Sequence, residues 1–188
     1  MPTLFFEFHG SGAAVAEQAQ RVGDIAREHD GGEFQWASRP EDRNRLWQAR
    51  DNTLYAGMAL RPGCRALITD VCVPISKLAE CILETRADID RSGLTVCIVG
   101  HVGDGNFHLL IIVDPADGAE IGRARALHDR MVRRALDLNG TCTGEHGIGA
   151  GKTEFLRAEL GAAVDVMRQV KLALDPANIM NPGKIFTV

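Results

Sequence analysis

Residues 94–113, LTVCIVGHVGDGNFHLLIIV, contain the clearest structural signal in the chain, because an Asp-Gly pair separates two apolar runs. Asp-Gly between two β-favouring runs is typical of a two-residue hairpin turn. We therefore predict two antiparallel strands joined by a type I′ turn at Asp104-Gly105. In this register His101 stands directly opposite His108, so both imidazoles lie on one face of the hairpin.

Helical and extended patterns alternate along the rest of the chain. Apolar residues at helical spacing predict helices over 11–28, from 40 to about 58, from 74 to about 92, over 119–138 and over 162–174. Apolar and β-branched runs predict strands over 3–8, 33–36, 65–73, 94–102 and 106–113. This order favours an α+β fold, in which a largely antiparallel, ferredoxin-like sheet layer is covered by helices. We expect one domain over residues 1–188.

Composition excludes several classes of protein. With 188 residues, 45% hydrophobic and 24% charged, the chain is neither a disordered tail nor a fibrous protein. A net charge of −4 without a Lys/Arg cluster argues against nucleic-acid binding. The apolar runs are too short to span a bilayer, and the N-terminus lacks a signal-peptide pattern. Five cysteines without CxxC spacing suit a reducing compartment, so we predict a cytoplasmic location.

The two hairpin histidines are candidate metal ligands. A hairpin that fixes His101 and His108 side by side prepares both rings before an ion arrives, as shared ligation requires. The alternative is that both are hydrogen-bonded histidines that cap a core hairpin. The spacing leaves both interpretations open, because a third ligand must come from elsewhere in the chain.

A glycine-rich stretch, TCTGEHGIG at residues 141–149, offers that third ligand. Glu145 could complete a His/His/carboxylate site with open positions, and His146 could then act as a general base. The alternative is a tight turn with an exposed Glu-His pair. A phosphate-binding loop ending at Lys152 is rejected, because His146 occupies the position where that motif requires its first glycine.

Arg50 is a candidate anion ligand. It lies on the same side of its predicted helix as Leu46 and Leu54, which places the guanidinium on the inward face. Such a group could hold a substrate carboxylate through two hydrogen bonds. A structural salt bridge to an aspartate or glutamate is an equally good interpretation.

Several motifs together resemble one family. They are LWQAR (46–50), TDVCVP (69–74), GHVGDGNFH (100–108), TGEHGIG (143–149), and DP (175–176) with MNPGK (180–184). In this order the chain resembles the C-terminal, substrate-side domain of the FAD-linked oxidases. That family includes D-lactate dehydrogenase (cytochrome), glycolate oxidase and D-2-hydroxyglutarate dehydrogenase. The stretch around TDVCVP looks most like the D-lactate dehydrogenase branch.

The resemblance implies a cap domain over a flavin that a separate domain of the vanillyl-alcohol-oxidase type holds. It implies an FAD-dependent dehydrogenase of D-lactate-like 2-hydroxy acids, whose hydride passes from the substrate Cα to FAD. The electrons would then pass to a cytochrome, a quinone or a flavoprotein. A peripheral position at an inner membrane would follow from such an acceptor.

The resemblance also implies roles for individual residues. His101, His108 and Glu145 would bind a divalent metal, which the donor set leaves open as zinc, manganese or iron. His146 would take the hydroxyl proton of the substrate, and Arg50 would hold its carboxylate. Asn181 and Lys184, in the tail, would lie toward the flavin.

Two departures from the family pattern modify these expectations. The FAD-binding domain is absent from this sequence, so we expect the chain to be inactive by itself and to be an excised domain or one half of a split enzyme. The hydroxyglutarate branch has a polar residue at the position of Leu110 and a lysine near Ile68, and the absence of both here favours a short 2-hydroxy acid. The alternative function is a non-catalytic metal-binding or interaction module of the same fold. An uncovered docking surface would favour a homo-oligomer.

Overall fold

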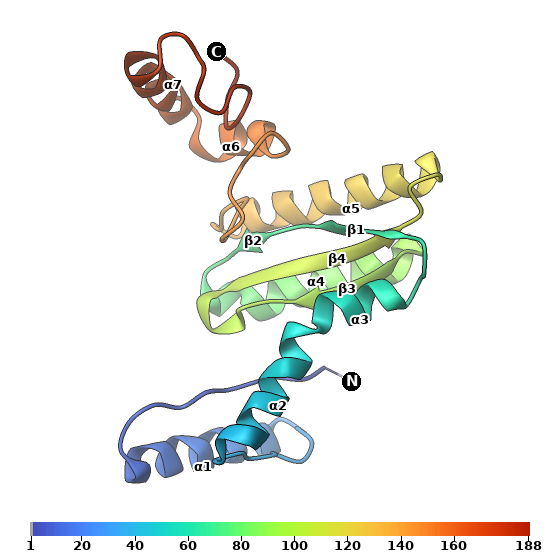
Figure 1. Cartoon of the computed structure of the whole chain (residues 1–188), viewed down its shortest axis with the longest axis vertical. Coiled ribbons are helices and arrows are strands. Elements are labelled where there is room, and N and C mark those ends of the chain that lie inside the picture. The colour runs from blue at the N-terminus through green and yellow to red at the C-terminus, as the bar shows by residue number, and fades with distance from the viewer. Residues whose placement is uncertain (1) are drawn as a thin grey trace. The chain divides into compact units, whose positions relative to one another are not determined.

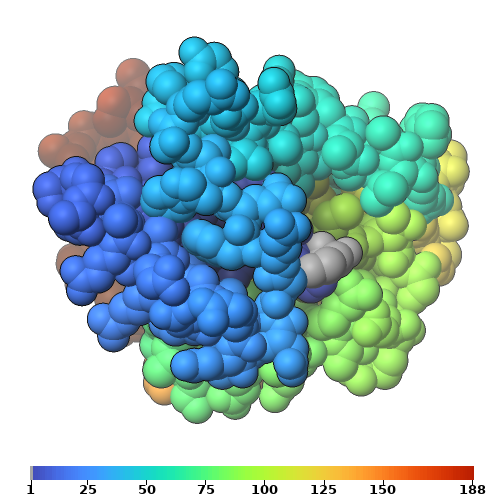
Figure 2. All heavy atoms as spheres, turned by 90° about the horizontal axis from the view of Figure 1, so that it is seen from below, coloured from blue at the N-terminus to red at the C-terminus, as the bar shows by residue number. Residues whose placement is uncertain are grey.

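The computed structural model describes residues 2–188 and divides the chain into two compact units, Met1–Asp51 and Asn52–Val188. The first unit contains helices α1 (Gly12–Glu28) and α2 (Pro40–Asp51). Ser11 caps α1, because its hydroxyl accepts the backbone N–H of Ala14. Figure 2 shows this unit as the blue part of the surface.

The two strands expected in the first unit are not formed. Residues 3–8 and 33–36 are irregular, although both segments belong to the described part of the chain. Their aromatic side chains stack instead, Phe5 on Trp47 at 6.5 Å and Phe8 on Trp36 at 6.2 Å between ring centroids. A β-favouring pattern needs a partner strand to become a sheet, and neither segment pairs with a strand here.

The second unit is built on an antiparallel sheet (Figure 1). Its strands are β1 (Arg65–Ile68), β2 (Val71–Cys72), β3 (Thr95–Val99) and β4 (Asn106–Val113). The central strand β4 pairs with β3 on one side and with β1 and β2 on the other. The expected α+β class, with a small antiparallel sheet covered by helices, is confirmed.

The expected strand over 65–73 is interrupted at Thr69 and Asp70. β1 and β2 keep the same register on β4 on either side of this break. Thr69 maintains the contact, because its N–H bonds to the Leu109 carbonyl and its hydroxyl accepts the Leu109 N–H, both at 3.0 Å. The break therefore leaves the sheet intact and frees the Asp70 side chain for other partners.

Five helices complete the second unit. They are α3 (Thr53–Ala59), α4 (Ile75–Ser92), α5 (Gly118–Asp137), α6 (Thr153–Leu160) and α7 (Ala163–Leu174). The helix expected from 40 to 58 is thus divided at Asn52, and α6 was not expected. Figure 1 shows α4 behind the strands and α3 in front of them.

The two faces of β4 have different neighbours, since successive side chains of a strand alternate between faces. Phe107, Leu109 and Ile111 are fully buried in the core cluster that also contains residues of α4 and α5. Leu110 lies on the opposite face, next to Gly57 of α3. Asn106 and His108 share this second face, so it is the one that carries the candidate site.

The predicted register of the hairpin is wrong. Val99, and not His101, pairs with His108, and residues 102–104 form a short 3₁₀ turn before Gly105. Gly105 has φ 77° and its carbonyl accepts the Val73 N–H at 3.0 Å. This hydrogen bond holds the connection between β3 and β4 against Val73. A loop longer than the expected two-residue type I′ turn therefore joins the strands.

Candidate metal centre

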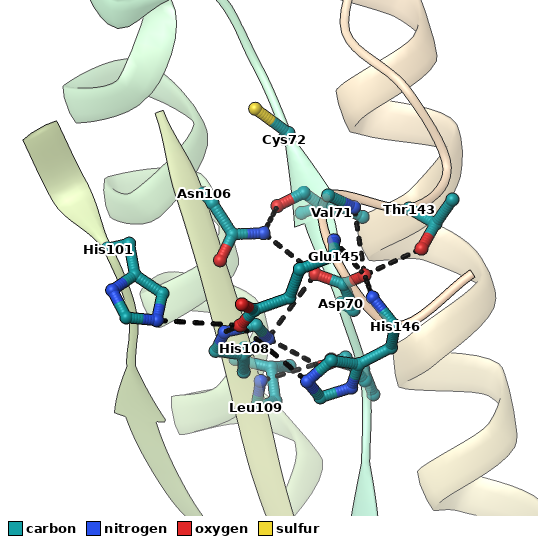
Figure 3. A network of polar contacts seen from close by, with 12 residues as sticks. Asp70, Val71, Cys72, His101, Asn106, His108, Leu109, Thr143, Glu145 and His146 are labelled. Atoms are coloured by element: carbon teal, nitrogen blue, oxygen red, sulfur yellow. Dashed lines mark hydrogen bonds and ion pairs between the residues drawn. The ribbon is translucent and has the colours of Figure 1, made fainter. Parts of the chain in front are cut away.

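His101, His108 and Glu145 come together in the second unit despite the changed register (Figure 3). One ligand atom from each lies within 4.8 Å of the others. Glu145 Oε1 is 2.8 Å from His108 Nε2 and 3.5 Å from His101 Nε2. The two imidazole rings lie edge to face, 6.2 Å apart. The geometry therefore brings together all three predicted metal ligands.

Strand β4 and its neighbours fix the orientation of His108. The ring is buried, and its Nδ1 lies 3.3 Å from both Asp70 Oδ1 and the Thr69 carbonyl. The hydrogen bond to Asp70 raises the pKa of His108, although burial opposes this change. With Nδ1 held by two oxygens, Nε2 is the nitrogen directed at Glu145, as a metal-binding histidine requires.

Asp70 organises the glycine-rich loop. Its Oδ2 accepts the Thr143 hydroxyl at 2.6 Å and the backbone N–H groups of Gly144, Glu145 and His146 at 2.8, 3.0 and 3.0 Å. Burial of this carboxyl would raise its pKa, but hydrogen bonds, from His108 first, hold the pKa well below the usual range. One ionised carboxylate thus fixes the backbone that presents Glu145 and His146.

Asp70 is absent from the sequence-based predictions. It stands in a strand-like run between Thr69 and Val71, and an acidic residue there is a signal of a buried hydrogen-bonded carboxylate. That signal is present in the sequence, but its partners cannot be known without the fold. Its loop partners lie between 73 and 76 residues further along the chain, and its other partners, Asn106 and His108, are on β4.

Lys152 stabilises the C-terminal end of the glycine-rich loop. Its ammonium group donates to the carbonyls of Asp70 and Cys142, at 2.5 and 2.7 Å. Burial lowers the pKa of Lys152. In the sequence this lysine is notable only as part of the rejected phosphate-binding motif. Its hydrogen bonds to the two carbonyls are seen only in the structure.

His146 lies beside the three ligands without belonging to them. Its ring stacks on His108 with 4.8 Å between centroids, and its Nε2 is 3.6 Å from Glu145 Oε1. The side chain is half-exposed. It also lines a pocket of about 370 Å³, together with Ile68, Arg125 and Lys152 among others. An accessible imidazole beside a pocket is suited to exchanging a proton with a bound molecule.

Three further predicted site residues are not part of the ligand set. Arg50 is in the first unit, where its guanidinium is 3.3 Å from Asp51 Oδ1. Asn181 and Lys184 are exposed in the tail, joined by a 3.3 Å bond from the Lys184 N–H to the Asn181 carbonyl. The roles proposed for these three residues stay predictions.

The donors present fit a divalent metal. Two imidazoles and a carboxylate converge, and both imidazole and carboxylate are ordinary ligands of zinc, manganese and iron. Within residues 2–188, the buried Asn106 Oδ1 has no hydrogen-bond donor. A buried acceptor without a donor needs a partner in the working protein.

Comparison with known proteins identifies the class to which this fold and site belong. Residues 1–185 match the family model described as FAD linked oxidases, C-terminal domain. The chain therefore belongs to this family, as the resemblance implied.

The individual relatives are larger proteins. The chain is 54% identical to the probable mitochondrial D-lactate dehydrogenase of Danio rerio, over 98% of this chain and 37% of that protein. It is 47% identical to the mitochondrial D-lactate dehydrogenase [cytochrome] of Arabidopsis thaliana, over 98% of this chain and 33% of the relative. It is 32% identical to glycolate oxidase subunit GlcD of Bacillus subtilis, over 97% of this chain and 39% of the relative.

The chain thus spans between 33% and 39% of the length of these relatives. The names of the two dehydrogenases place those proteins in mitochondria, and a cytoplasmic location for this chain stays a prediction. Among the described residues, no helix has the length and apolar character that crossing a membrane requires.

Proposed function

We propose that this chain is the substrate- and metal-binding domain of an FAD-dependent dehydrogenase that oxidises a short D-2-hydroxy acid such as D-lactate. The observation that carries the proposal is the convergence of His101, His108 and Glu145 next to the accessible His146. A divalent metal held by the first three would bind the hydroxyl and carboxylate oxygens of the substrate. Family membership and the dehydrogenase relatives support the same reaction class.

His146 is the proposed general base. It would accept the hydroxyl proton of the substrate at an imidazole nitrogen, while Asp70 holds its backbone N–H in place. FAD, when bound on its own domain, supplies the acceptor for the hydride from the substrate Cα. Asn181 and Lys184 are proposed to lie toward that flavin, consistent with their exposure.

The pocket beside His146 favours a small anionic substrate. Ile68 and Leu67 give it an apolar wall, while Arg125 and Lys152 add two positive charges to a lining that also contains the Asp70 carboxylate. An apolar wall suits the methyl group of D-lactate and offers no partner to a second carboxylate. We propose Arg50 of the first unit as the guanidinium that holds the substrate carboxylate in the assembled enzyme.

The test is binding of Mn²⁺ and Zn²⁺ to the full chain by calorimetry, followed by addition of D-lactate. We expect one metal per chain, D-lactate binding only in the presence of metal, and loss of both in His108→Ala. The same chain should oxidise D-lactate with a dye acceptor only after its FAD-binding domain is added. Absence of metal binding would overturn the proposal. Metal binding without any D-lactate binding or turnover would favour the non-catalytic module instead.

A further inference from the structure

Asn106 presents a buried oxygen that the proposed function does not use. The residue is 5% exposed, and its side chain lies on the same face of β4 as His108. Among the residues that the structure describes, no group donates a hydrogen bond to Oδ1. An unpaired buried amide oxygen is costly, so it should have a partner in the working protein.

The orientation of the Asn106 amide is fixed by its nitrogen. Nδ2 donates to Asp70 Oδ1 at 2.7 Å and to the Val71 carbonyl at 3.0 Å. A flipped amide would place its oxygen against these two acceptors, so the assignment of nitrogen and oxygen is unambiguous. Both hydrogens of the amide are therefore used, and only the oxygen remains.

The Asn106 oxygen points to the side of the site where the ligands lie. In Figure 3 the amide nitrogen is directed at Asp70 and Val71, while the oxygen is directed toward the side of His101 and the Glu145 carboxylate. The glycine-rich loop closes over the amide, since a Cβ at Gly144 would lie only 1.9 Å from Asn106 Nδ2. The loop leaves no room for the amide to turn away.

We infer that Asn106 Oδ1 is a further ligand of the divalent cation held by His101, His108 and Glu145. The inference rests on the proposed metal site and adds a neutral oxygen to its donor set. Amide oxygen is a hard donor that suits Mn²⁺ and its octahedral coordination, whereas two imidazoles and one carboxylate already give Zn²⁺ the three protein ligands of an open tetrahedral site. Asn106 would therefore set the preference of the site between these ions.

The experiment measures the affinities of Mn²⁺ and Zn²⁺ for the full chain by calorimetry, in the wild type, Asn106→Ala and Thr143→Val. Asn106→Ala should weaken Mn²⁺ binding by about tenfold or more and Zn²⁺ binding clearly less. Thr143→Val is the matched control, because it removes one hydrogen bond from Asp70 and leaves every oxygen and nitrogen donor of the site in place. It should change both affinities by a similar factor.

The outcomes separate this inference from the proposed function. If the wild type binds neither ion, the proposed metal site itself is wrong. If the wild type binds both ions and Asn106→Ala keeps the wild-type ratio of affinities, only the ligand role of Asn106 is wrong. Should Asn106→Ala fail to fold, a crystal structure of the wild-type chain with Mn²⁺ decides the question. We expect Oδ1 at about 2.2 Å from the ion, and a separation without direct contact would overturn the inference.

Discussion

Asp70 joins the two parts of the candidate site through a single carboxylate. One of its oxygens faces His108 of β4, and the other accepts three backbone N–H groups and one hydroxyl of the glycine-rich loop. Outer partners of this kind orient metal ligands before the ion arrives. Substitution of Asp70 should therefore lower the metal affinity beyond what a loss of fold stability alone would cause.

We predict that Asp70→Asn lowers metal affinity by about 10–100-fold, because the amide loses one acceptor atom and turns a donor toward the loop N–H groups. Equilibrium dialysis with Zn²⁺ measures the effect. Asp88→Asn, which also alters a buried aspartate but lies on α4, is the control for destabilisation alone. Equal affinity losses in both variants would show that Asp70 acts only through stability.

His146→Ala should remove catalysis without removing the metal. In the enzyme assembled with its FAD-binding domain, we expect turnover of D-lactate to fall by about 10²–10⁴-fold, the usual contribution of a positioned general base. Flavin absorbance and metal content should stay at wild-type levels, since His146 is outside the ligand set. Near-normal turnover would make the loop histidine structural.

Arg50→Lys should act on substrate binding. A lysine keeps the positive charge but loses the paired N–H groups that match a carboxylate, so KM for D-lactate should rise more than kcat falls. Steady-state kinetics of the assembled enzyme give both constants. Loss of flavin from this variant would instead assign Arg50 to the interface between domains.

At the scale of elements, an ionic cluster joins α4 to α5. The Asp88 carboxylate, 5% exposed, accepts two hydrogen bonds of 2.9 Å from Arg130 and one of 3.4 Å from Arg134. The hydrogen bond from Arg130 is the main cause that lowers the pKa of Asp88, and burial opposes it. The cluster ties together the two helices that cover the core face of the sheet.

The lowered pKa predicts a pH dependence of stability. A carboxyl whose pKa is lower in the folded than in the unfolded chain stabilises the fold at any pH above its unfolded pKa, about 3.9. This stabilisation is lost as the pH falls through the pKa of the folded state. Asp88→Asn should therefore cost about 1.5–3 kcal/mol at pH 7 and progressively less below pH 4. Urea unfolding at pH 7 and pH 3 measures the difference. The exposed pair of Arg86 with Asp90 supplies the control, Asp90→Asn, which should change stability little at either pH.

At the scale of the whole molecule, exposed apolar side chains gather on α7 and the tail after it. They include Val166, Val170, Leu174, Ile179 and Met180, each more than half exposed. Apolar surface of this kind favours association. We predict that the chain alone forms dimers or weak oligomers and that its FAD-binding domain reverses this association. Light scattering over a concentration series measures it, and a strict monomer at high concentration would contradict the prediction.

Sequence patterns predicted the α+β class and most helices, because apolar periodicity reports directly on which faces are buried. They failed for the segments 3–8 and 33–36, since a strand depends on a partner that periodicity does not describe. They also failed for the hairpin turn. The Asp104-Gly105 pair predicts a tight turn, but contact of Gly105 with Val73, distant in sequence, determines the loop that forms.

The sequence indicated the candidate metal ligands but not the residues that hold them in position. His101, His108 and Glu145 could be named as candidates from their residue types and from the family resemblance, although the local spacing left structural roles open for all three. Asp70, Asn106 and Lys152 act through hydrogen bonds to backbone atoms 10–82 residues away. Such contacts leave no trace in local spacing, so only the folded chain shows them.

The interruption between β1 and β2 has a consequence for the order of folding. Because the amides of Gly144, Glu145 and His146 bond to a carboxylate inside the sheet, they cannot be sheltered from solvent until chain segments more than 70 residues apart have met. Hydrogen exchange at these three amides should then follow the opening of the sheet and not the fast motion of a surface loop. We therefore expect the glycine-rich loop to become ordered late, together with the sheet to which it is bonded.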